Sequence, residues 1–235
     1  MRLVVLLALA LIGCAEPREP AETPEPQPAI FIPPTHRDGD RVVLPLTFPD
    51  GSRITIDYPP DLAIAELGLR PYGSATLEGD SPHPERDDTV GRDFLIRYGS
   101  AGETPLQPDA LQLELGRWTV EVYDYESGNP AAMTADERRS FQASLQGRET
   151  HDGFLVLEAT PPLTLAEAGE HAGPALHFGM SKRNPWLLLR LERCGPEAES
   201  TSRGFSSWCL SDSIVAHAYG GRRFRAAAAE GIELR

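Results

Sequence analysis

The chain has 235 residues, of which 40% are hydrophobic and 24% are charged, and this composition is ordinary for a globular protein. Its 35 acidic residues outnumber its 22 basic residues, which gives a formal net charge of −13 at pH 7. This charge argues against a nucleic-acid partner, since neutralising phosphates needs an excess of Lys and Arg. It also argues against electrostatic adhesion to anionic lipids.

The chain begins with a segment typical of an export signal. Arg2 is followed by an uncharged apolar run from Leu3 to Ile12, and the small residue Gly13 precedes Cys14. A charged start, an apolar run of about ten residues and a small residue at its end are the parts of a secretory signal. The run is too short for a membrane-spanning helix, which needs about 20 apolar residues.

The residues Leu11-Ile12-Gly13-Cys14 resemble the lipobox of bacterial lipoprotein precursors. The resemblance implies that residues 1–13 are removed as a signal peptide and that the thiol of Cys14 receives a diacylglyceryl group. It also implies an exported protein of the cell envelope, held on the extracytoplasmic side of the bacterial membrane by acyl chains such as palmitate. Two acyl chains anchor a protein stably, whereas one binds reversibly. The alternative is an ordinary secretory signal, although no A-x-A-like cleavage site follows Cys14.

Residues 14–34 are rich in proline and glutamate and are predicted to form a tether. Such a segment buries too little apolar surface to fold and stays extended. At about 3.1 Å per residue, about 20 residues reach roughly 60 Å. The apolar triplet Ile30-Phe31-Ile32 is the exception and is a candidate for docking on the folded domain.

Residues 35–235 are expected to form a single exported globular domain. It opens with a predicted β-hairpin, because apolar residues alternate over 42–48 and 54–58 on either side of a Pro-Asp-Gly turn. Pro45 within the first strand indicates an edge or a bulge. A helix of about two turns is predicted next, with Asp61 as its N-cap and Gly68 after its end.

Later elements follow the same signals. The segment 78–92 is predicted to be a loop, and a second helix is predicted to begin at the capping box of Thr134 and Glu137 and to end at Gly147. Consecutive leucines at 187–189 indicate a strand buried on both faces. Further strands are predicted at 69–77, 93–98, 111–115, 118–123, 154–157 and 186–191, and the tail is predicted to form a helix up to Glu230 and a strand at 232–234.

Strands outnumber helices, and no regular alternation of strand and helix is present. The predicted fold class is therefore α+β, with a mainly antiparallel β-sheet and two or three short helices.

Cys194 and Cys209 remain as an even pair once Cys14 is assigned to the lipid, and we predict that they form a disulfide in the oxidising compartment outside the cell membrane. A loop of about 15 residues gives roughly 3 kcal/mol of stabilisation in the chain-entropy model. Two free thiols are one alternative. A redox pair is another, although such pairs normally have C-x-x-C spacing.

No common catalytic motif, such as G-x-S-x-G, H-E-x-x-H or a P-loop, occurs in the exported domain. His171 and His177 have a spacing that suits neither a helical metal pair nor a zinc site. The acidic groups at 38–40 and 87–93 lack the ligand pattern of a calcium loop and are interpreted as solvated loops. No catalytic residue, metal site or cofactor is therefore assigned.

Two groups of residues can each be interpreted in two ways, as part of a binding site or as ordinary structure. Phe205 and Trp208 beside Cys209 could form an edge for stacking a ligand, but core packing beside the disulfide is the preferred reading. Glu121 and Asp124, between tyrosines, could form a sugar-binding or carboxylate pair, but the solvated side of a strand is preferred.

These observations favour a membrane-anchored envelope lipoprotein with a non-catalytic domain that binds an envelope protein or a small-molecule ligand. An envelope-acting hydrolase with a dispersed active site, or a structural lipoprotein, is the alternative.

Overall fold

The computed structural model describes residues 31–77, 92–100, 110–116, 118–126, 129–131, 133–170, 173–179, 185–202 and 204–235. Strands dominate these residues, and every strand pair among them is antiparallel. The fold is therefore α+β and mainly antiparallel, as the sequence predicts.

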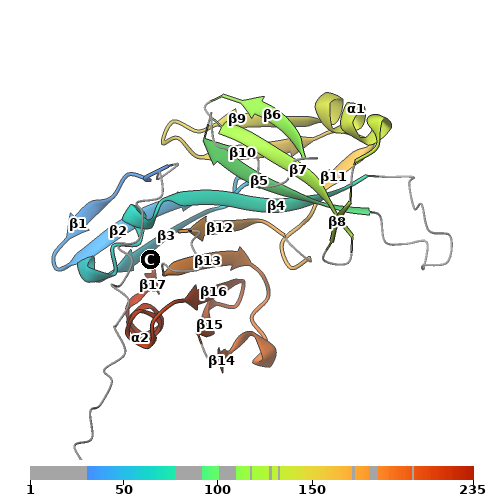
Figure 1. Ribbon diagram of the computed structural model, residues 1–235. Helices are drawn as coiled ribbons and strands as arrows, with labels where there is room; N and C mark the ends of the chain where they lie inside the picture. Colours follow the sequence, from blue (N-terminus) through green and yellow to red (C-terminus); the bar gives the residue numbers. More distant parts are fainter. Residues whose placement is uncertain are drawn as a thin grey trace, which may run out of the picture.

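The largest sheet contains eleven strands among the described residues (Figure 1). Its main path runs in the spatial order β14 (Ser200–Ser202), β15 (Phe205–Ser211), β16 (Ile214–Tyr219), β13 (Trp186–Leu191), β12 (Ala175–Phe178), β4 (Leu69–Leu77), β5 (Arg92–Ser100), β7 (Trp118–Glu126) and β6 (Leu111–Leu115). Off this path, β11 (Leu163–Leu165) pairs with β4, and β8 (Asn129–Ala131) pairs with β7. Strand β4 links the halves of the sheet, because one edge pairs with β12 and β11 in turn while the other pairs with β5.

A smaller sheet contains, in spatial order, β1 (His36–Asp38), β2 (Arg41–Thr47), β3 (Arg53–Tyr58) and β17 (Glu233–Leu234). The predicted hairpin is confirmed, since β2 and β3 pair with Leu44 opposite Ile56. Strand β1 pairs only with the residues from Arg41 to Val43, so β2 has an open edge around Pro45, which suits proline. The strands β9 (Leu145–Glu149) and β10 (Leu155–Ala159) form a separate pair.

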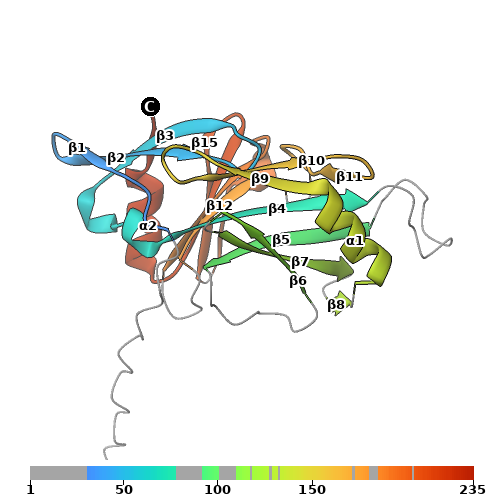
Figure 2. The ribbon, with the colours of Figure 1, turned by 90° about the horizontal axis from the view of Figure 1, so that it is seen from above.

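The helices are α1 (Ala135–Ser144), α2 (Arg222–Gly231) and the 3-10 turns η1 (Pro60–Leu62), η2 (Ala65–Leu67) and η3 (Pro196–Ala198). Figures 1 and 2 place α1 and α2 at opposite ends of the molecule. The predicted capping box is confirmed: the N–H of Glu137 donates to the Thr134 hydroxyl at 3.2 Å, and the N–H of Thr134 donates to the Glu137 carboxylate at 2.6 Å. The predicted C-terminal helix and strand are likewise confirmed as α2 and β17.

Two predicted helix boundaries are wrong. Helix α1 ends at Ser144, and Gly147 lies inside β9, where a Cβ would come within 2.7 Å of the Leu115 side chain. The glycine therefore serves close packing and not helix termination. The predicted two-turn helix is replaced by η1 and η2, because Ala63 between them adopts a left-handed conformation with φ 48°, and Asp61 lies inside η1 instead of capping it.

The strand β13 is buried on one face, which corrects the prediction of burial on both. Leu187 and Leu189 are buried, whereas Leu188 is half-buried. Leu188 shares the outer face of the sheet with His217, its cross-strand neighbour on β16. The remaining predicted strands are confirmed within a few residues, and residues 78–91 of the predicted loop lie outside the described residues.

Phe31 belongs to the main hydrophobic core, just before the expected start of the domain at residue 35. Its ring meets Trp118 edge-on at 5.7 Å and Phe154 at 5.3 Å between ring centroids, and its carbonyl accepts the N–H of Leu69 at 2.7 Å. Ile32, in contrast, is 57% exposed. Docking of the apolar triplet thus rests on Phe31, and Ile30 lies outside the described residues.

A buried carboxylate fastens β17 to β3. Asp57 on β3 accepts hydrogen bonds from the Nε atoms of Arg41 and Arg235, and Arg41 also donates to the carbonyl of Gly231 at 2.6 Å. Arg235 extends to Asp38 at 2.7 Å. These contacts join β1, β2, β3 and the end of α2 around one negative charge.

Candidate functional site

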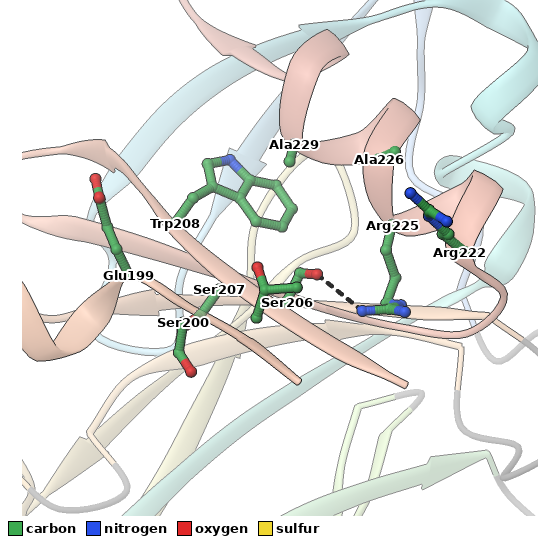
Figure 3. Close-up of a pocket in the computed structure, with 10 residues that line it drawn as sticks. Glu199, Ser200, Ser206, Ser207, Trp208, Arg222, Arg225, Ala226 and Ala229 are labelled. Atoms are coloured by element: carbon green, nitrogen blue, oxygen red, sulfur yellow. Dashed lines mark hydrogen bonds between the residues drawn. The ribbon is translucent and has the colours of Figure 1, made fainter. Parts of the chain in front are cut away.

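A cavity with polar side chains on its walls lies between α2 and the β14–β15 end of the large sheet, with a volume of about 580 Å³ (Figure 3). Its lining comprises Glu199, Ser200, Thr201, Ser206, Ser207, Trp208, Arg222, Arg225, Ala226 and Ala229. We call it the α2 pocket. Its volume lies within the range of small-molecule sites in proteins.

The sheet side of the α2 pocket is an antiparallel edge. Ser200 on β14 lies opposite Ser207 on β15, and Thr201 lies opposite Ser206. The disulfide between Cys194 and Cys209, which the sequence predicts, ties the segment before β14 to β15, with 5.7 Å between the Cα atoms. The covalent bond thus limits how far this edge strand and its loop can move away from β15.

The helix side presents one face of α2. Arg222, Arg225, Ala226 and Ala229 follow the spacing i, i+3, i+4, i+7, which places them on the same face of a helix. The neighbouring Ala228 is buried against the core. Alanine and arginine favour helix, and the small alanines let α2 lie near β15 while leaving room for a cavity.

Arg225 is held in place by backbone carbonyls. Its Nε donates to the carbonyl of Gly220 at 3.1 Å, and its Nη1 lies within 3.0 Å of the carbonyls of Ser202 and Phe205. Nη1 also reaches the hydroxyl of Ser206 at 3.1 Å, the contact drawn as a dashed line in Figure 3. Nη2 donates to no other described residue, so part of this oriented guanidinium remains available to a ligand.

Arg222 is exposed, and no hydrogen bond or ion pair joins it to another described residue. Figure 3 shows its side chain and that of Arg225 both at the α2 side of the pocket, away from Glu199. The α2 pocket therefore has a positive end with two guanidinium groups and an opposite end with one carboxylate.

Trp208 forms the apolar wall of the pocket between those ends. The residue is half-buried and packs partly against the core, so the preferred sequence interpretation is confirmed in part, but it also lines the cavity. Its indole N–H is buried and donates to no acceptor in the described residues. Phe205 lies on the other face of β15 and stacks on His217, with 5.6 Å between ring centroids.

Some hydroxyl groups of the pocket already form hydrogen bonds within the protein, and others do not. Ser207 donates to the carbonyl of Ala198 at 2.5 Å, and Ser206 accepts from Arg225. Ser200 and Thr201 are exposed and make no side-chain hydrogen bond to another described residue. They can therefore donate to or accept from a ligand.

The groups singled out from the sequence are dispersed. Cys14, His171, Asp87 and Asp88 lie outside the described residues. Glu121 is 6% exposed, so the interpretation that it lies on the solvated side of a strand is wrong. The side chain of Asp124 is not among those that the structure describes.

His217 lies on the outer face of the sheet and does not line the α2 pocket, although its cross-strand neighbour Ser207 does. Burial and the positive charge of Arg190 lower the pKa of its imidazole, although Glu192 opposes this shift. His217 is therefore neutral at pH 7.

No cluster of three His, Cys, Asp or Glu side chains among the described residues is arranged to hold a metal ion. No described helix has the length and apolarity that a membrane crossing requires.

Sequence reasoning missed both arginines of the pocket. A usable signal was present, since "RRFRAAAAEG" combines three basic residues in the first turn of α2 with no side-chain N-cap and no acidic residue there. This arrangement is unfavourable for the dipole of the helix itself, so the arginines are candidates for a role outside α2.

The fold and pocket define a mainly antiparallel α+β protein with an open, polar site at one end of its large sheet. No protein-family model, no curated protein and no solved structure matches the chain.

Proposed function

We propose that this protein is a lipid-anchored extracytoplasmic binding protein and that the α2 pocket takes a small molecule. The single observation that carries the binding site is a cavity of about 580 Å³ in which two guanidinium groups and two hydroxyl groups have bonding capacity that the described residues do not use. Polar groups converging on an aromatic wall are characteristic of ligand sites.

The lining favours binding over catalysis. A nucleophilic serine needs a base within hydrogen-bond reach. Ser206 instead accepts from a guanidinium, and Ser207 donates to a backbone carbonyl. Glu199 is the carboxylate of the lining, and the lining includes no His or Lys. These side chains can orient a ligand by charge and hydrogen bonds, and no proton-transfer pair is assembled among them.

The lipid anchor is proposed from the sequence at Cys14. Expression of the full precursor in a bacterial host should place the wild-type protein in the membrane fraction after alkaline washing, and Cys14→Ser should release it. Mass spectrometry of the mature N-terminus should show a diacylglyceryl adduct on Cys14. A Cys14→Ser protein that stays in the membrane fraction would contradict the anchor.

The binding site is tested by a thermal-shift screen of the purified full-length Cys14→Ser chain against envelope glycan fragments, lipids and common metabolites. A ligand at about 100 times its Kd adds about 2.7 kcal/mol, which raises Tm measurably. Ala229→Phe fills the pocket and should abolish the shift. Glu230→Phe, one residue along α2 and outside the lining, is the matched control and should keep it. A shift that survives Ala229→Phe would place binding elsewhere.

A further inference from the structure

We infer that the ligand of the α2 pocket is a hydroxylated ring that carries a carboxylate or a phosphate, such as an acidic or phosphorylated sugar. This inference rests on the proposed function and adds the chemical class of the ligand. It is drawn from three parts of the pocket: its positive end, its aromatic wall and its hydroxyl edge.

The positive end calls for an anion. The chain carries 13 more acidic than basic residues, yet Arg222 makes no ion pair with a described residue. Arg222 and Arg225 also stand one turn apart at the positive end of α2, where no acidic side chain offsets them. An anionic group placed between them would be held by both charges.

Arg225 fixes where that anion binds. Carbonyls of Gly220, Ser202 and Phe205 orient its guanidinium from three sides. A guanidinium held in this way loses little conformational freedom when it binds, and the N–H groups of Nη2, which no described residue uses, can donate charge-assisted hydrogen bonds to an oxygen of a carboxylate or phosphate. Arg222, which is exposed and unrestrained, can close on the same anion from the side of solvent.

The remaining walls select a ring with hydroxyl groups. Trp208, with Ala226 and Ala229 on α2, offers an apolar surface against which the C–H face of a ring can pack. Ser200 and Thr201, which also line the pocket, carry hydroxyl groups that no described residue uses. Glu199, at the end opposite Arg222 in Figure 3, accepts hydrogen bonds from ring hydroxyls and repels a second anion. A simple apolar acid would leave these groups unpaired.

The test is titration calorimetry of the purified full-length Cys14→Ser chain with four probes: glucuronate, glucose 1-phosphate, glucose and inorganic phosphate. We expect at least one of the two anionic sugars to bind about tenfold or more tightly than both glucose and phosphate. The comparison of glucuronate with glucose 1-phosphate then separates a carboxylate from a phosphate ligand. Raising the salt concentration should weaken the anionic sugars and leave glucose unchanged.

Substitutions in the first turn of α2 test whether the affinity for the anionic sugar comes from the pocket. Arg222→Gln should remove about tenfold of the affinity for the anionic sugar and leave glucose binding as it was. Arg223→Gln is the matched control, because Arg223 is exposed, adjacent and outside the lining, and it should change affinity by less than about twofold. Trp208→Leu should weaken both sugars, with circular dichroism used to verify folding.

The outcomes separate the inference from the proposed function. Equal affinity for glucuronate, glucose 1-phosphate and glucose, or an equal loss in Arg222→Gln and Arg223→Gln, overturns the anionic class but leaves a binding pocket. No binding of any sugar at about 10 mM also overturns the inference. The proposed function then still stands if another ligand gives a thermal shift that Ala229→Phe abolishes, and it fails if none does.

Discussion

Replacing Asp57 with Asn tests how the C-terminal strand is held. Asp57 accepts hydrogen bonds from Arg41 and Arg235, which approach from β2 and from the residue after β17. Asn keeps the size of the side chain but removes its charge and turns one acceptor into a donor that faces a guanidinium. The two arginines are then left close together without the carboxylate between them.

The expected loss of stability in Asp57→Asn follows from how deeply the three side chains are buried. The Asp57 side chain is 7% exposed, whereas those of Arg41 and Arg235 are 24% and 38% exposed. A hydrogen bond to a charged group contributes about 1.5–3 kcal/mol, and breaking a fully buried pair costs about 3–5 kcal/mol. Because both arginines keep contact with water, we expect Asp57→Asn to lower the free energy of unfolding by about 2–3 kcal/mol at pH 7. This corresponds to a Tm lower by about 5–10 °C.

The loss depends on pH in a defined direction. Burial by itself raises the pKa of Asp57, but the hydrogen bonds and charges of Arg235 and Arg41 outweigh it, so the pKa lies below the ordinary 3.8. The unfolded state therefore binds the proton at higher pH than the folded state. The stabilisation is complete above about pH 5 and is lost as the pH falls through the lowered pKa. The difference between wild type and Asp57→Asn should shrink over the same range.

Urea denaturation of the full-length Cys14→Ser chain and of the same chain with Asp57→Asn, at pH 7, 5 and 3, measures both effects. The control is Asp38→Asn, because Asp38 is 61% exposed and its one described partner is Arg235, so less than about 1 kcal/mol should be lost. A loss below about 0.5 kcal/mol for Asp57→Asn, or a difference from wild type that is the same at pH 7 and pH 3, would refute the reasoning.

Three further substitutions have outcomes that the structure fixes. Thr134→Ala removes the cap of α1 and should cost about 1 kcal/mol, measured by urea denaturation, while an unchanged midpoint would contradict the cap. Replacing Cys194 and Cys209 with Ser should cost about 3 kcal/mol, and intact mass after alkylation without reductant should show no free thiol in the wild type. Phe31→Ala should cost about 3–5 kcal/mol, and a loss under about 1 kcal/mol would exclude Phe31 from the core.

Local signals correctly predicted most of the strands, the start of α1 and the C-terminal helix α2. The alternation on either side of Pro49-Asp50-Gly51 is self-contained, and the Thr134–Glu137 box needs only four residues to form. The errors came from residues whose conformation depends on distant partners. Gly147 looks like a helix stop, yet its place is set by Leu115 on another strand.

The candidate site was harder to predict, because it joins β14, β15 and α2 across a contact that no local pattern encodes. Trp208 was noticed for its place beside Cys209, but its role depends on the face of α2 that lies over it. Arg225 is oriented by carbonyls up to 23 residues away in sequence. Net charge pointed away from an anion site, because a sum over the chain hides a local excess of arginine.

The entry of Phe31 into the core determines how mechanical force would reach the folded protein. If Cys14 is lipidated as proposed, a pull on the domain away from the membrane acts through Phe31, between Trp118 and Phe154, and through the bond to Leu69 at the start of β4. The load falls on tightly packed rings and on a central strand, not on an edge strand that peels away one bond at a time. If residues 15–30 form the extended tether that the sequence predicts, a reach of about 50 Å at about 3.1 Å per residue would set the height of the domain above the bilayer. On that proposal, insertions or deletions before Phe31 would change the height of the domain without changing the contacts of Phe31 with the core.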